Sequence, residues 1–226
     1  MIPLDILSDP ICPWCCIGKA RLDKAIAETG RNPFVLRWRM FRLNPDMPVE
    51  GMDRRAYLEA KFGGPERAQA VYDSIAETAA ADGLDLHLDK IARTPNTLDA
   101  HRLIRWAATE QCETVLVERL FDDYFRQGRD ISERSVLLDA AEAVGLERSV
   151  IACLLDGDSE RAALEAEEAE ARSMGVGGVP CFIVNGRHVL SGAQDSATWA
   201  RVIFELDQAL AQSQSPPQSA AEGQPS

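Results

Sequence analysis

The sequence predicts an α/β fold in which a β-α-β half and a β-β-α half flank a large all-helical insertion. Two strand patterns lie near the start of the chain and two near its end, whereas the region between them carries helical patterns. A chain of 226 residues is long enough for one domain with a sizeable insertion, and its core needs no disulfide staples. The six cysteines are therefore not required for folding.

The first half begins with a short apolar run. Residues 2–8 form this run, which stops at Asp9-Pro10 and so predicts a buried strand that enters a loop. A helical pattern follows and should end near Gly30, with Asn32-Pro33 beyond it. Residues 34–43 then alternate between apolar and polar side chains, which predicts a second strand.

The middle of the chain reads as helices. Apolar residues recur there at helical spacing, and the predicted helices cover residues 55–62, 66–82, 97–111, 115–127, 135–144 and 158–174. Leu84, Leu86 and Leu88 alternate briefly, but one such stretch does not make a sheet.

The second half begins with the Gly-rich loop of residues 175–180. Residues 181–184 and 187–191 are typical of strands joined by the tight turn Asn185-Gly186, and residues 195–211 of an amphipathic helix. This order is that of a thioredoxin fold with a helical insertion. We expect residues 1–50 and 175–212 to form the thioredoxin-like domain, residues 51–174 the insertion, and residues 213–226, rich in Ser, Gln and Pro, a disordered tail.

The charge of the chain excludes some partners. Its 24 basic and 36 acidic side chains give a net charge of −12 without a basic stripe, which argues against nucleic acid and membrane surfaces. The first residues lack the basic region and cleavage site of a signal peptide. We therefore expect a cytoplasmic protein, in which a close cysteine pair is more often catalytic or metal-binding than structural.

Cys12 and Cys15 form a Cys-x-x-Cys where the first strand gives way to the first helix. Two cysteines so spaced can close a disulfide, and the helix start favours a thiolate at the first of them. Cys12 is thus the expected nucleophile and Cys15 the resolving thiol. Pro13 suits the first helical position, and Trp14 adds apolar surface without charge.

Two other roles for this cysteine pair remain open. Both thiols could be buried structural side chains. Zinc is a further alternative because Cys16 is adjacent, but no second cysteine pair or closely spaced histidine pair completes a tetrahedral set, and we expect no metal.

Val179-Pro180 should complete the site. X-Pro bonds are rarely cis, yet this proline precedes the third strand, where a thioredoxin fold carries a cis-proline that faces the active cysteine. The Val179 backbone would then offer an edge to an extended peptide.

Three segments together resemble the DsbA family of thiol-disulfide oxidoreductases, above all its cytosolic FrnE-like branch. They are Ser8-Asp9-Pro10-Ile11-Cys12-Pro13-Trp14-Cys15, residues 96–102, and residues 175–182 with Gly192-Ala193-Gln194. The resemblance covers about residues 1–212. It implies a thioredoxin fold with a helical insertion, dithiol-disulfide exchange through Cys12 and Cys15, and a cis bond before Pro180.

The same family also implies a second hypothesis. It includes 2-hydroxychromene-2-carboxylate isomerase and kappa-class glutathione transferases, which carry serine at the position of Cys12 and use bound glutathione. A glutathione-dependent isomerase or transferase is therefore the alternative to redox exchange, and a redox-sensitive binding or holdase module that uses the surface beside Trp14 is a third. We expect thiols and disulfides of proteins or small molecules as partners, no tightly bound cofactor, and glutathione as a candidate co-substrate; monomer and homodimer both stay open.

The remaining candidate residues have a structural and a functional interpretation. Cys181 could pair with Cys12 or fill the start of a strand, and Cys16 should pack in the first helix. Asn96 reads first as an N-cap, and His101 as a core histidine that could face the site. Two further cysteines, Cys112 and Cys153, should be buried, and an acidic run should form a solvated helix face with a Glu168–Arg172 pair: Glu165, Glu167, Glu168 and Glu170.

Overall fold

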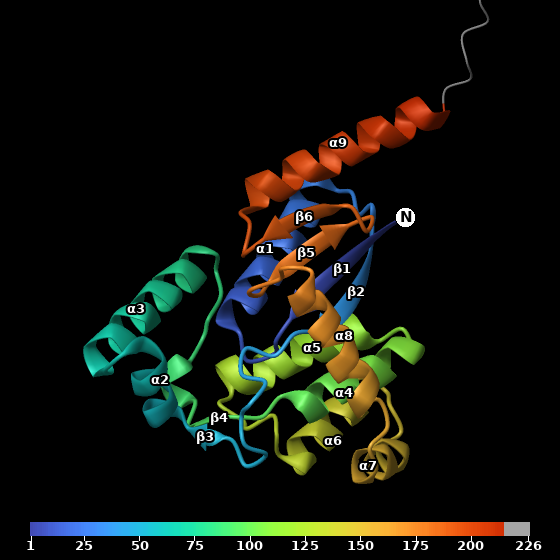
Figure 1. Cartoon of the computed structure of the whole chain (residues 1–226). Coiled ribbons are helices and arrows are strands. Elements are labelled where there is room, and N and C mark those ends of the chain that lie inside the picture. Colours follow the sequence, from blue (N-terminus) through green and yellow to red (C-terminus); the bar gives the residue numbers. More distant parts are fainter. Residues whose placement is uncertain (215–226) are drawn as a thin grey trace, which may run out of the picture.

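A four-stranded mixed sheet lies at the centre of the computed structural model, which describes residues 1–214 (Figure 1). Its strands are β1 (Ile2–Ser8), β2 (Phe34–Met40), β5 (Cys181–Val184) and β6 (His188–Ser191), in the order β2-β1-β5-β6. β1 pairs in parallel with β2 and antiparallel with β5, which pairs antiparallel with β6. The first and last parts of the chain therefore build one sheet, as the sequence predicts.

Helices α1 (Pro13–Thr29) and α9 (Ser196–Gln214) pack together on one face of this sheet. Trp199 of α9 is fully buried there, with its ring 4.9 Å from that of Phe182 and 6.0 Å from that of Phe34. Gly30 ends α1 in the left-handed conformation (φ 64°), which glycine adopts without steric cost. The predicted tail at 213–226 lies outside the described residues, except that residues 213 and 214 continue α9.

The insertion packs against β2 and below the sheet in Figure 1. Its elements are β3 (Met52–Asp53), α2 (Arg54–Phe62), α3 (Pro65–Ala81), η1 (Leu88–Lys90), β4 (Arg93–Thr94), α4 (Leu98–Thr109), α5 (Glu113–Phe121), η2 (Asp122–Arg126), α6 (Arg134–Ala143), α7 (Arg148–Asp156) and α8 (Arg161–Ser173). A helical insertion is thus confirmed, although the expectation of helices alone misses a small β3–β4 ladder.

Two details of the insertion differ from the sequence prediction. No helix was predicted for α7, which has only nine residues; its apolar residues form a nearly continuous run at 150–155 that hides the i, i+3, i+4 spacing of Ile151, Leu154 and Leu155, and only Ile151 is buried. The two-residue strands β3 and β4 are too short for a periodic signal. Arg54 supports them from inside, since its guanidinium donates to Tyr72 Oη at 2.6 Å and to Thr94 Oγ1 at 3.1 Å.

The two parts of the chain share one large hydrophobic core. Ile11, Cys12, Cys15 and Ile17 belong to the same cluster of buried residues as the inner side chains of α4, α5 and α6. Two ion pairs also join α1 to the insertion, Lys19–Glu118 at 2.6 Å and Arg21–Asp82 at 2.7 Å. Among residues 1–214, no helix is both long and apolar enough to cross a bilayer.

Candidate active site

Cys12 and Cys15 lie at the junction of β1 and α1. Cys12 is the N-cap residue of α1, with an extended backbone (φ −88°, ψ 113°), and Pro13 takes the first helical position, where its missing N–H costs nothing. The Cys12 carbonyl accepts the Cys15 N–H at 3.0 Å and so closes the first turn. The first turn of α1 contains no acidic residue, so no side chain of that turn opposes the positive end of the helix dipole at Cys12.

Both thiols are free and buried, with 3% of Cys12 and 2% of Cys15 exposed. Burial raises the pKa of Cys15 well above its ordinary value, and the adjacent Cys12 thiol raises it further. The Ser8 hydroxyl and the Asp9 N–H act in the opposite direction but do not outweigh burial. The fold therefore holds Cys15 as a neutral thiol.

The loop at residues 175–180 closes over Cys12. The Val179-Pro180 bond is cis, as the resemblance implies, and the Cys12 thiol donates to the Val179 carbonyl over 3.7 Å. Gly18 permits this approach, because a Cβ at that position would lie 3.1 Å from Pro180 Cγ. A groove of about 470 Å³ follows residues 174–181 and the exposed edge strand β6.

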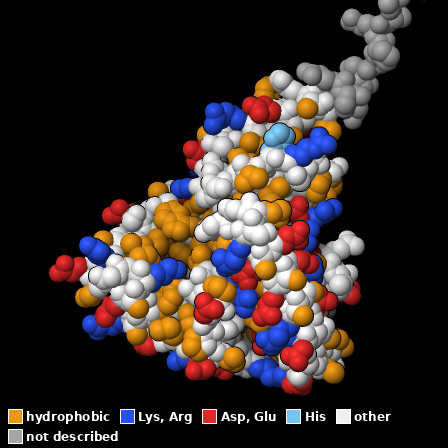
Figure 2. Space-filling view, viewed as in Figure 1, with side chains coloured by type: hydrophobic (Ala, Val, Ile, Leu, Met, Phe, Trp, Pro, Cys, Tyr) orange, Lys and Arg blue, Asp and Glu red, His pale blue; other side chains and the backbone are white. Residues whose placement is uncertain are grey.

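Trp14 is half-buried and packs against the large core cluster, so only part of its ring is open to solvent. Figure 2 shows hydrophobic side chains gathered on the surface between α3 and the start of α1. The Cys12 end of the helix is therefore bordered by apolar surface.

Asp9 is a residue of the site to which the sequence analysis assigned no role. Its carboxylate is completely buried and accepts the N–H of Leu43 at 2.7 Å and of Ile11 at 3.3 Å. Burial raises the pKa of Asp9 to about 6, although these hydrogen bonds favour the charged form. Asp9 therefore fixes the loop that carries Cys12. The sequence feature that could have indicated this role is a charged residue directly after a buried strand.

His101 of α4 combines the two interpretations offered by the sequence. It is buried, and its Nε2 lies 3.9 Å from Asp9 Oδ1. Burial lowers the pKa of His101 to about 3, so the imidazole is neutral at physiological pH. His101 is therefore a core histidine that also borders Asp9 in the loop before Cys12.

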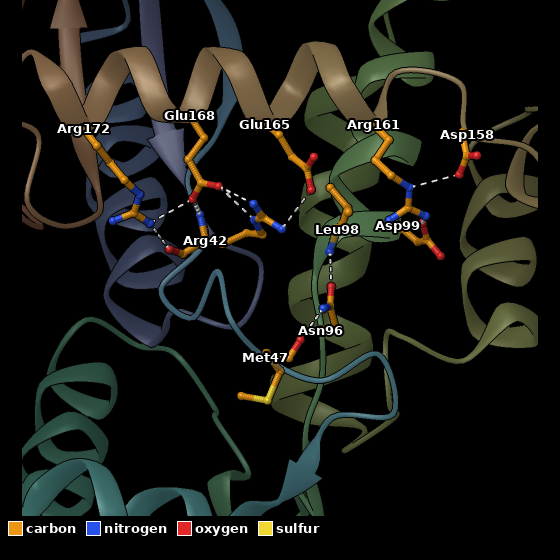
Figure 3. A network of polar contacts seen from close by, with 10 residues as sticks. All are labelled: Arg42, Met47, Asn96, Leu98, Asp99, Asp158, Arg161, Glu165, Glu168 and Arg172. Carbon is orange, nitrogen blue, oxygen red and sulfur yellow. Dashed lines mark hydrogen bonds and ion pairs between the residues drawn. The ribbon is translucent and has the colours of Figure 1, made fainter.

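Asn96 links two loops rather than occupying the N-cap itself. Thr97 is the N-cap residue of α4, one position later than predicted, while Asn96 Oδ1 accepts the Leu98 N–H at 3.0 Å. Its amide donates to the Met47 carbonyl at 2.7 Å, as Figure 3 shows. Asn96 thus fixes the start of α4, and with it the position of His101.

Glu168 corrects the prediction of a solvated acidic face on α8. Only 3% of Glu168 is exposed, and its carboxylate accepts from the Arg42 guanidinium at 2.7 Å and from Arg172 at 2.9 Å (Figure 3). Burial raises the pKa of Glu168, but hydrogen bonds from Arg172 and Arg42 outweigh this effect and hold it below its ordinary value. The predicted pair with Arg172 is confirmed, whereas the buried contact with Arg42 depends on tertiary packing.

The other four cysteines are free thiols as well. Cys181 is buried in a cluster with Leu7, Phe41 and Ala171, which favours the packing interpretation. Cys16 is half-buried, and burial raises its pKa to about 12. The prediction that Cys153 is buried is wrong, because α7 lies at the surface and turns this thiol outward; Cys112 is half-buried. Within residues 1–214, no group of three or more His, Cys, Asp or Glu side chains could hold a metal ion.

Comparison with known proteins identifies the family. A model of the DSBA-like thioredoxin domain matches residues 3–204. The chain belongs to this DsbA-like family. A curated protein of Bacillus subtilis, "Uncharacterized protein YwbO", is 26% identical over 208 residues, which are 90% of this chain and 96% of YwbO.

Solved structures of other proteins share the fold. A probable DsbA oxidoreductase from Streptomyces coelicolor is 28% identical, with a TM-score of 0.82 over 97% of this chain and 94% of that one. A 2-hydroxychromene-2-carboxylate isomerase is 17% identical, with a TM-score of 0.69 over 94% and 100% of the two chains. The cytosolic disulfide reductase DsbM from Pseudomonas aeruginosa, solved with GSH, is 19% identical, with a TM-score of 0.65 over 91% and 99%.

Proposed function

We propose that this protein is a thiol-disulfide oxidoreductase that exchanges a Cys12–Cys15 dithiol or disulfide with thiols and disulfides of proteins or small molecules. One observation carries the proposal: Cys12 is the N-cap residue of α1, its thiol donates to the Val179 carbonyl, and Cys15 lies one turn further along the helix. In this arrangement one sulfur lies at a helix start beside a groove, and the second lies where it can attack the mixed disulfide formed by the first.

The exchange proceeds in two balanced steps. The Cys12 thiolate attacks one sulfur of a substrate disulfide, a mixed disulfide forms, and the other substrate sulfur leaves as a thiolate that takes up a proton. Cys15 then loses its proton and attacks Cys12 Sγ, which forms the Cys12–Cys15 disulfide and releases the second substrate thiolate. Two electrons pass to the substrate in this direction, and the reverse sequence oxidises a dithiol.

The different surroundings of the two thiols support this division of roles. Cys12 lies at the start of α1, where the positive end of the helix dipole interacts favourably with negative charge. The Cys15 pKa is raised by burial, so Cys15 remains protonated and does not compete for the substrate. Cys12 is therefore the nucleophile and Cys15 the resolving thiol.

The groove along residues 174–181 and β6 is the proposed substrate site. An extended segment there would meet the Val179 backbone and the exposed edge of β6, so main-chain hydrogen bonds would bind substrates of varied sequence. Glutathione is a candidate co-substrate, since the structure of DsbM contains GSH. A cytosolic setting like that of DsbM would supply the reducing thiols that return Cys12 and Cys15 to the dithiol.

Insulin reduction with glutathione as reductant tests the proposal. The wild-type protein should catalyse it, and Cys12→Ser should lower the rate to the uncatalysed level because no nucleophile remains. Cys15→Ser should accumulate a mixed disulfide between Cys12 and the substrate, visible as a mass increase that dithiothreitol reverses. Full insulin reduction by Cys12→Ser would contradict the proposal.

The alternative hypothesis of a glutathione-dependent isomerase or transferase predicts a different result for Cys15. In that mechanism Cys15 is dispensable, so Cys15→Ser would isomerise or conjugate an aromatic substrate with glutathione at the wild-type rate. Cys153→Ser is the matched control, because this exposed thiol lies on α7 and should affect neither activity.

A further inference from the structure

A cavity of about 580 Å³ lies in the insertion between α2, α3 and η1. It shares no lining residue with the proposed substrate groove, and α2 and α3 form the side of the insertion away from α7 and α8 in Figure 1. Apolar side chains form much of its wall: Leu58, Pro65, Ala68, Leu88 and Ile91. Pockets for small molecules have volumes of about 300–1,000 Å³, mostly apolar walls and a few polar groups that orient the ligand. The cavity therefore has the size and the walls of a ligand site.

One buried cation, Arg54, lines this cavity. Arg54 is only 8% exposed, and its guanidinium donates to two neutral oxygens, Tyr72 Oη at 2.6 Å and Thr94 Oγ1 at 3.1 Å. The rings of Tyr57, Tyr72 and Tyr124 lie 5.7, 5.6 and 5.9 Å from Arg54 Cζ. Aromatic faces attract a cation, but they supply no full negative charge. The positive charge of Arg54 is therefore only partly balanced.

The other buried cations of residues 1–214 show what Arg54 lacks. Each of them forms an ion pair with a carboxylate, and these pairs are Lys19–Glu118 at 2.6 Å, Arg42–Glu168 at 2.7 Å and Arg102–Asp99 at 2.8 Å. Arg54 forms no ion pair with any carboxylate of the described chain. Buried arginine and lysine side chains in proteins are almost always paired, because an isolated charge is costly to remove from water. A carboxylate from outside the chain would give Arg54 the kind of partner that the other three have.

The part of Arg54 without a partner is open to a ligand. Its Nε and Nη1 atoms form the two hydrogen bonds, whereas Nη2 donates to no residue among 1–214 and yet is not among the polar atoms sealed from solvent. Tyr72, which accepts from Nε, lines the same cavity as Arg54. The cavity is therefore the route by which Nη2 reaches solvent, and Nη2 has N–H groups free to donate to an anion.

Acidic side chains at the same cavity limit the charge that a ligand can carry. Asp53, Glu59 and Asp89 also line it. Asp53 accepts the N–H of Ala56 as the N-cap of α2, and Glu59 pairs with Arg55 at 2.7 Å. A phosphate ester or another multiply charged anion would be repelled by these carboxylates, whereas a single carboxylate needs only one countercharge.

We propose that this cavity binds a small organic monocarboxylate, whose carboxylate accepts hydrogen bonds from Arg54 and whose apolar body packs against Leu58 and Ile91. The site is separate from thiol exchange, because neither Cys12 nor Cys15 lines the cavity. It therefore does not rest on the proposed function.

Calorimetric titration of the full chain with 4-phenylbutyrate, its neutral amide 4-phenylbutanamide, and inorganic phosphate tests the ligand class. The acid should bind saturably and at least about tenfold more tightly than the amide, because only the acid offers a charged acceptor to Arg54. Phosphate should bind more weakly than the acid. No saturable binding of 4-phenylbutyrate up to about 10 mM, equal binding of acid and amide, or tighter binding of phosphate would overturn the proposal.

Nuclear magnetic resonance locates the site. On addition of 4-phenylbutyrate, backbone amide signals of α2 and η1 should shift, while those of residues 175–181 in the proposed substrate groove should stay in place. Shifts confined to the groove would place the acid there and overturn the proposed site.

Variants of two adjacent arginines test the role of Arg54. Arg54→Lys keeps the charge but loses the planar group that binds a carboxylate with two hydrogen bonds, so it should weaken 4-phenylbutyrate binding roughly tenfold. Arg55→Gln is the matched control and should change the Kd by less than about twofold, because the Arg55 side chain is 84% exposed and already pairs with Glu59. Equal losses in the two variants would overturn the assignment to Arg54.

Leu58→Trp keeps the test decisive if Arg54→Lys fails to fold. It fills the cavity while Arg54 stays in place, so it should abolish binding of both the acid and the amide, and unchanged binding would overturn the proposed site. Insulin reduction reports the other proposal separately and should proceed at the wild-type rate in Arg55→Gln and Leu58→Trp. A wild-type protein that binds 4-phenylbutyrate but does not reduce insulin would overturn the proposed function and support this site.

Discussion

At the residue scale, Asp9 and His101 act on stability in opposite directions. Burial raises the pKa of Asp9 from 3.8 to about 6 and lowers that of His101 from 6.5 to about 3. Between about pH 4 and 6 the folded protein holds a neutral acid beside a neutral imidazole, whereas the unfolded chain carries both charges. As the pH rises through this window, the contribution of Asp9 to the free energy of unfolding therefore falls and that of His101 rises. The two changes nearly cancel.

Single substitutions should remove this cancellation. The free energy of unfolding of Asp9→Asn, minus that of the wild type, should rise by roughly 2 kcal/mol from about pH 4.5 to 6.5, because the variant lacks the unfavourable ionisation of Asp9. For His101→Gln, the same difference in free energy of unfolding should fall by a similar amount over this pH range. Urea unfolding of each variant and of the wild type at about pH 4.5 and 6.5 measures these differences. A variant whose difference from the wild type is the same at both pH values would contradict the prediction.

At the element scale, α8 is held to the end of β2 by a buried ion pair. Glu168 receives three hydrogen bonds from Arg42, of which one comes from its backbone N–H at 2.7 Å, and a fourth from Arg172. The neighbouring Glu165 lies 3.7 Å from Arg42 but is half-exposed. Two carboxylates one turn apart thus have different surroundings, and only that of Glu168 is buried.

Glu168→Gln should lower the free energy of unfolding by about 3 kcal/mol, because Arg42 would remain buried without its main countercharge. Glu165→Gln is the matched control and should cost under about 1 kcal/mol, since an exposed pair contributes little. Chemical denaturation of the two variants and the wild type measures both values. Equal losses would show that the burial of Glu168 does not matter.

At the scale of the whole molecule, the insertion and the sheet share a core. The largest hydrophobic cluster runs from α1, which begins at Cys12, through α4, α5 and α6, so the division at residues 51 and 174 describes topology rather than separate cores. The ion pairs Lys19–Glu118 and Arg21–Asp82 cross the same boundary. We therefore expect the insertion and the sheet to unfold together.

Native-state hydrogen exchange tests this cooperativity. The slowest amides of β1 and those of α4 should open with free energies that agree within about 1 kcal/mol and equal the global value, because neither part keeps its core alone. If the α4 amides opened at a much lower free energy than the β1 amides, the insertion would be a separate unit.

The sequence by itself determined the order of the strands and helices along the chain, the helical character of the middle segment and the position of Cys12 and Cys15 at the start of α1. These features depend on local spacing, on turn residues such as Asn185-Gly186 and on the Cys-x-x-Cys motif. Only the tertiary structure decided the environments of Ser8, Asp9, His101 and Glu168, because burial and the atoms that meet there come from distant segments. The same acidic residue type is solvated or buried according to what packs on it, as the half-exposed Glu165 and the buried Glu168 of α8 show.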